Sequence, residues 1–252
     1  MNISISTPPQ NPTELVSDAE VPDESMFLPP PRIPTIKDLY NDSTIKPTLP
    51  DKIRYQPDSS LLDRISLWQG DITKLKVDSI VNAANKSLLG GGGVDGAIHF
   101  AAGRQLVEEC RKLNGCATGQ AKITRGYNLP SRHVIHTVGP VYSLSDVEEK
   151  AQQLASCYKT SLEVAVENDA RHIAFPSVST GIYGYPIVAA TRIALGEVRR
   201  FCDADADKKL DRVIFVVWKD TDKAVYESLI PEYFPPIPED EQKSDGLYEP
   251  VV

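Results

Sequence analysis

The sequence predicts an α/β fold in which a mixed β-sheet is covered by helices on both faces. Apolar runs with a period of two alternate with helix-period stretches between about residues 59 and 235. Two of the apolar runs, "AKITRGY" and "HVIHTVG", follow each other with no helix between them. A pair of strands joined so closely predicts a mixed sheet and not a wholly parallel one.

The strands are expected where apolar residues alternate and turn residues follow. In chain order the runs are "RISLWQG", "DSIVNAAN", "AKITRGY", "HVIHTVG", "HIAFPSVS" and "RVIFVVW". Each run is short enough for one strand of a globular domain. No internal repeat is visible in the sequence.

Three helical regions separate these runs. Residues 94–113 predict one broken helix or two abutting helices, ended by Gly115. Residues 145–169 predict a long amphipathic helix, and residues 186–202 predict a third one with Pro186 at its first helical position. The apolar face of the long helix comprises Ala151, Leu154, Tyr158, Leu162 and Ala165.

The two ends of the chain differ in composition from the middle. Eleven of the 20 prolines precede residue 58, so residues 1–58 are predicted to be an extended, mostly unfolded arm. Within this arm, "PTIKDLYND" predicts one short helix able to dock on the main domain, with Thr35 as N-cap and Ile36, Leu39 and Tyr40 on one face. Residues 236–252 predict an acidic tail.

Composition excludes several classes of function. A chain of 252 residues with 41% hydrophobic content can bury one sizeable core. Its net charge of -8 argues against direct nucleic-acid binding and against electrostatic attachment to an anionic membrane. No apolar run approaches the length of a membrane span and no targeting signal is recognisable, so a cytoplasmic or nuclear protein, acting as a monomer, is expected.

The cysteines give no sign of a metal or redox centre. Cys110, Cys116, Cys157 and Cys202 lack CxxC spacing and the paired histidines of a zinc site. We expect reduced, mostly buried thiols, no metal and no cofactor.

A glycine-rich stretch, "GGGGVDGAIH", contains a GxGxxG pattern at Gly91, Gly93 and Gly96. A dinucleotide fingerprint needs its glycines directly after a strand and an acid about twenty residues on. Here "NAANKSLL" separates strand from glycines, and the later segment "LNGCATG" has no acid. A Walker A loop is excluded because no GK[ST] follows. Two interpretations remain, a flexible connection or a backbone brought close to a ligand.

Other segments favour a ligand, although each has a structural alternative. A second loop, "SVSTGIYGYP", leads from a strand into a helix, where backbone amides and the hydroxyls of Ser179 and Thr180 suit a diphosphate. Asp71 of "GDIT" suits an adenine amino group or an Asx turn. The amides of Asn82 and Asn85 suit ribose hydroxyls or a chain turn.

Two further residues lie on the helix that follows the first glycine loop. Asp95 is expected at the start of this helix, either as a helix-capping acid or as a functional one. His99 lies four residues later on the same face.

Taken together, these segments resemble the macrodomain family, in particular its MacroD-type branch. The matching motifs are "GDIT", "VNAAN", "LLGGGGVDGAIH", "AAG", "LNGCATGQAKIT", "VIHTVGP" and "STGIYGYP", in the branch's order. The resemblance covers about residues 61–234. It implies a three-layer αβα fold over residues 59–235, with an ADP-ribose cleft between the two glycine loops.

The resemblance also implies roles for individual residues. Asp71 would accept a hydrogen bond from the adenine amino group, and Ile72 would offer a backbone donor to the ring. Asn82 and Asn85 would meet the distal ribose. The catalytic group would be Asp95 beside the scissile bond, with Asn85 and with His99 as support. The backbone around the diphosphate would comprise Gly91, Gly92, Gly93, Val94, Ser179, Thr180, Gly181, Ile182, Tyr183 and Gly184, with the Tyr183 ring against the distal sugar.

Three functions follow from these features. The first is a hydrolase that removes mono-ADP-ribose from modified Asp or Glu side chains of proteins, with O-acetyl-ADP-ribose as a second ester substrate. The second is a reader that binds ADP-ribose and ADP-ribosylated proteins without turnover. The third is a purely structural use of the motifs. A reader needs the amides but not an acid at Asp95, so the hydrolase is favoured; whether Asp95 acts as a base or only orients water stays open.

Overall fold

Six strands form one mixed sheet at the centre of the molecule. The computed structural model describes residues 27–205 and 207–237. The sheet order is β1-β6-β5-β2-β4-β3, and every neighbouring pair is parallel except β3 with β4. The strands are β1 (Ile65–Gln69), β2 (Ser79–Ala84), β3 (Ala121–Arg125), β4 (His133–Val138), β5 (His172–Pro176) and β6 (Arg212–Val217). The predicted mixed sheet is confirmed, because the short β3–β4 connection forces the antiparallel pair.

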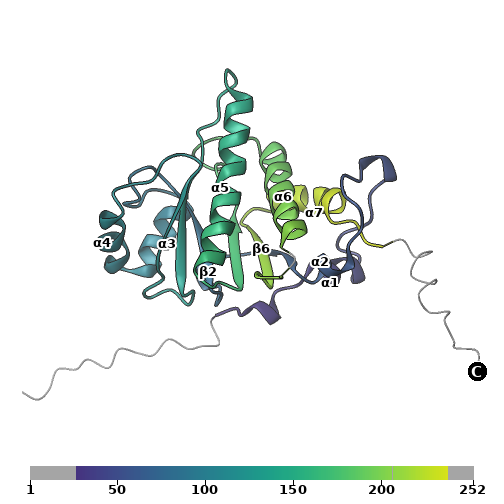
Figure 1. The fold of residues 1–252 in the computed structure, drawn as a ribbon, viewed down its shortest axis with the longest axis horizontal. Coiled ribbons are helices and arrows are strands. Elements are labelled where there is room, and N and C mark those ends of the chain that lie inside the picture. Colours follow the sequence, from purple (N-terminus) through teal and green to yellow (C-terminus); the bar gives the residue numbers. More distant parts are fainter. Residues whose placement is uncertain (1–26, 206, 238–252) are drawn as a thin grey trace, which may run out of the picture.

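Helices cover both faces of the sheet (Figure 1). One core joins the sheet to α5 (Val147–Glu167), α6 (Ile187–Ala204) and α7 (Asp220–Tyr233). The other core joins it to α3 (Val94–Ala102) and α4 (Arg104–Lys112). Neighbouring strand residues alternate between the two cores, as Phe215 and Ile214 do on β6. The fold is therefore the expected three-layer αβα arrangement.

The structure decides one open helix prediction and differs from another. Gly103, with φ of +83°, separates α3 from α4, so the region 94–113 holds two abutting helices. Pro186 is the N-cap of α6 and lies one residue before its first helical position, with an extended ψ of 124°. The expected face of α5 is buried at Leu154, Tyr158, Leu162 and Ala165.

The described part of the N-terminal arm, residues 27–58, packs on the domain. Thr35 caps α1 (Ile36–Asn41) through a capping box with Asp38, and Ile36 and Leu39 enter the core. The other short helices are η2 (Pro30–Arg32) and η3 (Pro50–Lys52), and α2 (Ser59–Leu62) follows directly after this segment. The expectation of a mostly unfolded arm is wrong for these residues, because their spaced apolar side chains supply enough burial to fix them.

The remaining predictions for the termini lie outside the described residues, from 1 to 26 and from 238 onward. All four cysteines are buried and free, as expected. Among the helices of the described ranges, none has the length and hydropathy needed to span a bilayer. The proposed boundaries at residues 59 and 235 stay a prediction.

Candidate active site

A cavity of about 880 Å³ opens beyond the carboxyl ends of the parallel strands. This edge is where ligands bind in open α/β sheets, because the loops that follow the strands gather there. Both glycine loops and the segment after β1 reach this cavity. The predicted residues that line it are Asp71, Ile72, Asn85, Gly91, Gly92, Gly93, Val94, Asp95, Ser179, Thr180, Gly181, Ile182 and Tyr183.

The first glycine loop packs tightly against the start of α3. A Cβ on Gly96 would lie 2.6 Å from the Gly91 carbonyl oxygen. A Cβ on Gly91 would lie 2.9 Å from Asp95 Oδ2 and 3.1 Å from Asn85 Nδ2. Glycine at these two positions therefore lets the loop fold onto the helix and brings the Asp95 carboxylate beside its backbone.

The second glycine loop is held at both ends. The Tyr185 amide donates to the Ser179 carbonyl at 3.0 Å, and the Tyr142 amide donates to the Tyr183 carbonyl at 2.9 Å. Ser179 has a φ of +66°, which is unusual for a residue with a side chain. The loop is thus fixed in a conformation that turns its backbone toward the cavity, a strain of the kind found at ligand sites.

The two loops offer unused backbone donors. Within the described ranges, the amides of Gly91 to Val94 and of Gly181 to Tyr183 donate to no protein acceptor. Such groups favour an anionic ligand such as a diphosphate, and the N-terminus of α3 adds its dipole. Gly184 differs from the expectation, since its amide donates to the Gly181 carbonyl and the residue does not line the cavity.

Asp95 is the buried acid of the cavity, with 3% of its surface exposed. It lies in the first turn of α3, and its Oδ1 accepts a hydrogen bond from Asn82 Nδ2 at 2.7 Å. Burial raises the pKa of the Asp95 carboxyl above its ordinary value, while the Asn82 bond and His99 oppose the rise. A carboxylate with a raised pKa is a stronger base once it is ionised.

His99 lies one turn further along α3, with its Nε2 3.4 Å from Asp95 Oδ1. Burial lowers the pKa of the imidazole, and the nearby carboxylate opposes that shift. The side chain does not line the cavity. The imidazole therefore contacts Asp95 from the side away from the cavity.

Asn82 differs from the position that the resemblance implied. Its side chain is fully buried and does not reach the cavity surface. On β2, Ile80, Asn82 and Ala84 face the layer of α3 and α4, so the amide lies beneath α3. Asn82 contacts Asp95 and His136 where a contact with the distal ribose was expected.

Asn85 lines the cavity, and its amide also organises the first loop. Its Nδ2 donates to the Gly90 carbonyl at 2.8 Å, and its Oδ1 accepts from the Ser87 amide and hydroxyl. Asp71 likewise makes the Asx turn that was weighed against ligand binding, since its Oδ1 accepts from the Thr73 amide at 3.0 Å and from the Thr73 hydroxyl at 2.7 Å. Asp71 and Ile72 still line the cavity, so the turn is compatible with a ligand contact.

Several lining residues were not among the predicted site residues. Trp218 follows β6, is 72% exposed and lines the cavity. Its place after a strand, like that of the two glycine loops, was the available signal. Others that line the cavity are Gly139, Ser177, Tyr185, Ile187, Lys219 and Asp222.

His99, Cys110 and His136 form a group whose ligand atoms lie within 4.8 Å of one another. The chemistry of this group opposes metal binding. Both imidazole nitrogens of His136 already contact protein partners, Asn82 and Thr124. Burial raises the pKa of the Cys110 thiol to about 11, which keeps it protonated.

The comparisons with known proteins agree with this geometry. A family model described as "Macro domain" matches residues 81–194. The macro domain-containing protein CT2219 of Chlorobaculum tepidum is 55% identical over 174 residues, which cover 69% of this chain and 98% of that protein. The chain belongs to the macro domain family.

Other macro domains extend the comparison. ADP-ribose glycohydrolase MACROD2 of Xenopus laevis is 50% identical over 205 residues, 81% of this chain and 48% of that protein. The chain therefore spans about half the length of this relative. The crystal structure of a Trypanosoma brucei macrodomain in complex with ADP-ribose has a TM-score of 0.68 and 40% identity, covering 80% of this chain and 76% of that one. The resemblance to the MacroD-type branch is confirmed.

Proposed function

We propose that this macro domain is a hydrolase that removes mono-ADP-ribose from modified Asp and Glu side chains of proteins. The bond cleaved is the ester between the anomeric carbon of the distal ribose and the protein carboxylate. The hydroxyl group of a water molecule joins the anomeric carbon, and the proton of the water leaves with the released carboxyl group. The products are ADP-ribose with a free hydroxyl group and a protein with its carboxylate restored.

The observation that carries this proposal is the buried carboxylate of Asp95 at the wall of the cavity. The free amides of the two glycine loops lie in the same cavity, so a diphosphate held by them would set the position of the attached ribose. Asp95 would accept a proton from the attacking water or orient that water toward a ligand phosphate. Its raised pKa favours the first role.

The remaining residues would bind and orient the ligand. Asp71 and Ile72, which line the cavity after β1, would receive the adenine ring. Asn85 and Tyr183 would approach the distal ribose from the two loops. His99 would support Asp95 from behind. O-acetyl-ADP-ribose would fit the same site because it also carries an ester on the ribose.

The relatives support this proposal. MACROD2 of Xenopus laevis and MACROD1 of Mus musculus carry the name ADP-ribose glycohydrolase and are 50% and 47% identical to this chain. ADP-ribose and ADP-ribosylated proteins are accordingly the partners that we propose. We also propose that the protein acts as a monomer in the cytoplasm or nucleus. Its net charge of -8 argues against direct nucleic-acid binding.

A reader function is the alternative, favoured by the free amides of both loops, which are sufficient for binding. A reader has no need of a desolvated acid at the cavity wall, and burying Asp95 in the position seen here costs stability. The hydrolase therefore explains one more feature of the site than the reader does.

The test combines release and binding. ADP-ribose release from a protein mono-ADP-ribosylated on glutamate is measured for wild type and Asp95→Ala, with calorimetric binding of free ADP-ribose to both. We expect Asp95→Ala to lower the release rate by about 10³-fold while binding changes by less than about threefold. Binding by wild type with no release would make the domain a reader. Full release by Asp95→Ala would remove Asp95 from the chemistry.

A further inference from the structure

A buried chain of polar side chains runs from the sheet to Asp95. Asn82 on β2 pairs in register with His136 on β4, and both face the layer of α3 and α4. Both side chains have no exposed surface. Asn82 reaches Asp95 Oδ1 at 2.7 Å, and the ring of His136 reaches Thr124 on β3 at 2.9 Å. The chain therefore links β3, β4, β2 and α3.

The directions of the hydrogen bonds in this series of side chains follow from the orientation of the Asn82 amide. Asn82 Nδ2 can only donate, and it lies 3.1 Å from His136 Nδ1, so Nδ1 accepts and carries no proton. Burial lowers the pKa of His136 to about 3, so the ring is neutral and its proton lies on Nε2. Nε2 then donates to the Thr124 hydroxyl at 2.9 Å.

The orientation of the Asn82 amide depends on both of its acceptors. Its two N–H bonds go to Asp95 Oδ1 and His136 Nδ1, while its own Oδ1 is buried with no hydrogen-bond partner among the described residues. A flipped amide would aim its oxygen at both acceptors, and each would then need a proton. The observed orientation accordingly matches an ionised Asp95 and a His136 protonated on Nε2.

We propose that His136, acting through the amide of Asn82, is a positioning residue that keeps the Asp95 carboxylate ionised and aligned for the hydrolysis. His136 Nδ1 accepts a hydrogen bond from Asn82 Nδ2. This bond fixes the amide with its N–H groups toward Asp95. Without that acceptor, the flipped amide oxygen could accept a hydrogen bond from the O–H of a neutral Asp95, and the ionised form would lose its advantage. This inference rests on the proposed function for its effect on rate, but not for its effect on Asp95.

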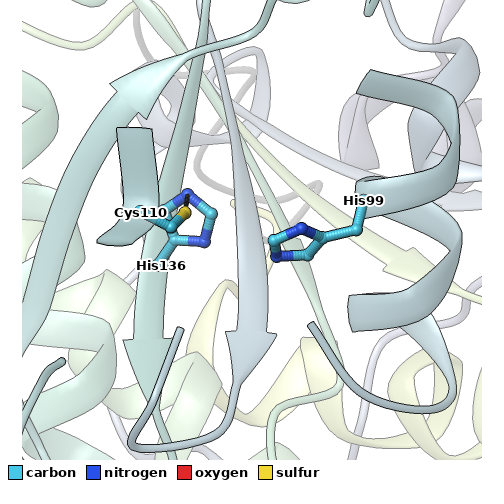
Figure 2. A group of neighbouring side chains, drawn as sticks. All are labelled: His99, Cys110 and His136. Atoms are coloured by element: carbon cyan, nitrogen blue, oxygen red, sulfur yellow. Dashed lines mark hydrogen bonds between the residues drawn. The ribbon is translucent and has the colours of Figure 1, made fainter. Parts of the chain in front are cut away.

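Few other titratable groups among the described residues lie next to the series Thr124, His136, Asn82 and Asp95. Figure 2 shows the His99 ring directed from α3 toward His136, and Cys110 from α4 beside the His136 ring. His99 Nε2 is 3.4 Å from Asp95 Oδ1, and Cys110 Sγ is 3.6 Å from His136 Nε2. Glu109 acts on Cys110, whose thiol remains protonated because burial raises its pKa to about 11. Among these groups, His99 is the other ionisable side chain beside Asp95, and burial lowers the pKa of its imidazole below the ordinary value.

The experiment compares two replacements of His136 with a matched control. His136→Leu removes the acceptor, while the side-chain oxygen of His136→Asn can accept at the Nδ1 position. Cys110→Ala removes a buried thiol that contacts the His136 ring but leaves the hydrogen bonds from Thr124 through His136 and Asn82 to Asp95 in place. Release of ADP-ribose is measured against pH, and the titration of Asp95 is followed by carboxyl-carbon NMR in each protein.

For His136→Leu we expect kcat near neutral pH to fall by about tenfold with KM within about twofold. The acid limb of its pH profile and the Asp95 titration should both move to higher pH. His136→Asn should stay within about threefold of wild type, and Cys110→Ala should keep the wild-type profile and titration. An unchanged Asp95 titration in His136→Leu, an equal shift in Cys110→Ala, or no recovery in His136→Asn would each overturn the proposal.

Two safeguards separate the outcomes. If His136→Leu does not fold, Thr124→Val takes its place with Thr124→Ser as control. The Thr124 hydroxyl accepts from His136 Nε2 and so favours the tautomer with its proton on Nε2. Without the hydroxyl, the proton can move to Nδ1, which then no longer accepts from Asn82. Thr124→Val should shift the Asp95 titration upward, and Thr124→Ser should not. If wild type releases no ADP-ribose, the proposed function fails, and the NMR titration still decides the role of His136.

Discussion

Two aspartates flank strand β2, and they differ in how many donors surround their carboxylates. Asp78 precedes the first residue of the strand, and Asp95 lies beyond its other end on α3. Asp78 Oδ2 accepts from the amides of Arg171 and His172 at 2.9 and 3.0 Å and contacts His172 Nδ1 at 2.8 Å. Its Oδ1 pairs with Arg132 at 3.1 Å.

Asp95 has far fewer partners. One hydrogen bond from Asn82 at 2.7 Å and a histidine nitrogen at 3.4 Å are its polar contacts in the described structure. Burial raises the pKa of both aspartates, yet the donors around Asp78 outweigh burial and hold its pKa below the ordinary value. The number of donors, and not burial alone, therefore decides whether the pKa of a carboxyl is lowered, as at Asp78, or raised, as at Asp95.

The larger stability effect is expected at Asp78. Asp78→Ala leaves the amides of Arg171 and His172 without their acceptor, so it should lower the free energy of unfolding by about 2 kcal/mol. Urea unfolding followed by circular dichroism measures the loss. Release of ADP-ribose at a temperature where the variant is folded should stay within about threefold of wild type.

The pH dependence of that loss sharpens the comparison. Because the folded pKa of Asp78 is lowered, its contribution is present above the ordinary pKa of 3.8 and disappears as the pH falls through the lower folded value. The difference between wild type and Asp78→Ala should therefore shrink at acid pH. A loss that is independent of pH would mean that the carboxylate charge is not what stabilises this end of the sheet.

A smaller effect of opposite sign is expected at Asp95. Its folded pKa lies above the ordinary 3.8, so between these two values the folded state holds more protons and stability falls as the pH rises. Asp95→Asn removes that cost and should raise Tm near neutral pH by roughly 2 °C while release is lost. Differential scanning calorimetry at neutral pH and near pH 4 tests this, since the gain should diminish in acid. A lower Tm at neutral pH would contradict the account.

The sequence predicted those parts of the molecule that depend on local pattern. Each of the six apolar runs forms a strand, and Thr35 caps a helix as expected, because alternation and capping act over a few residues. The motifs around Asp95 and Ser179 also indicated which loops would meet, and both line the cavity.

The rest depended on contacts between distant segments. β2 is buried on both faces, so alternation could not show that Asn82 points beneath α3 instead of into the cavity. Its partnership with His136 requires β4 to lie beside β2, 54 residues along the chain, which no local signal gives. The packing of Ile33, Ile36 and Ile45 likewise depends on surfaces formed by later residues.

The most direct test of the central claim is the rate of a single turnover of ester-linked ADP-ribose by wild type as a function of pH. If the poorly solvated carboxylate of Asp95 performs the chemistry, the rate should fall on acidification with an apparent pKa clearly above the 3.8 of an ordinary aspartate. A rate that stays constant down to about pH 4 would show that an unperturbed group, or none, is involved, and would contradict the account.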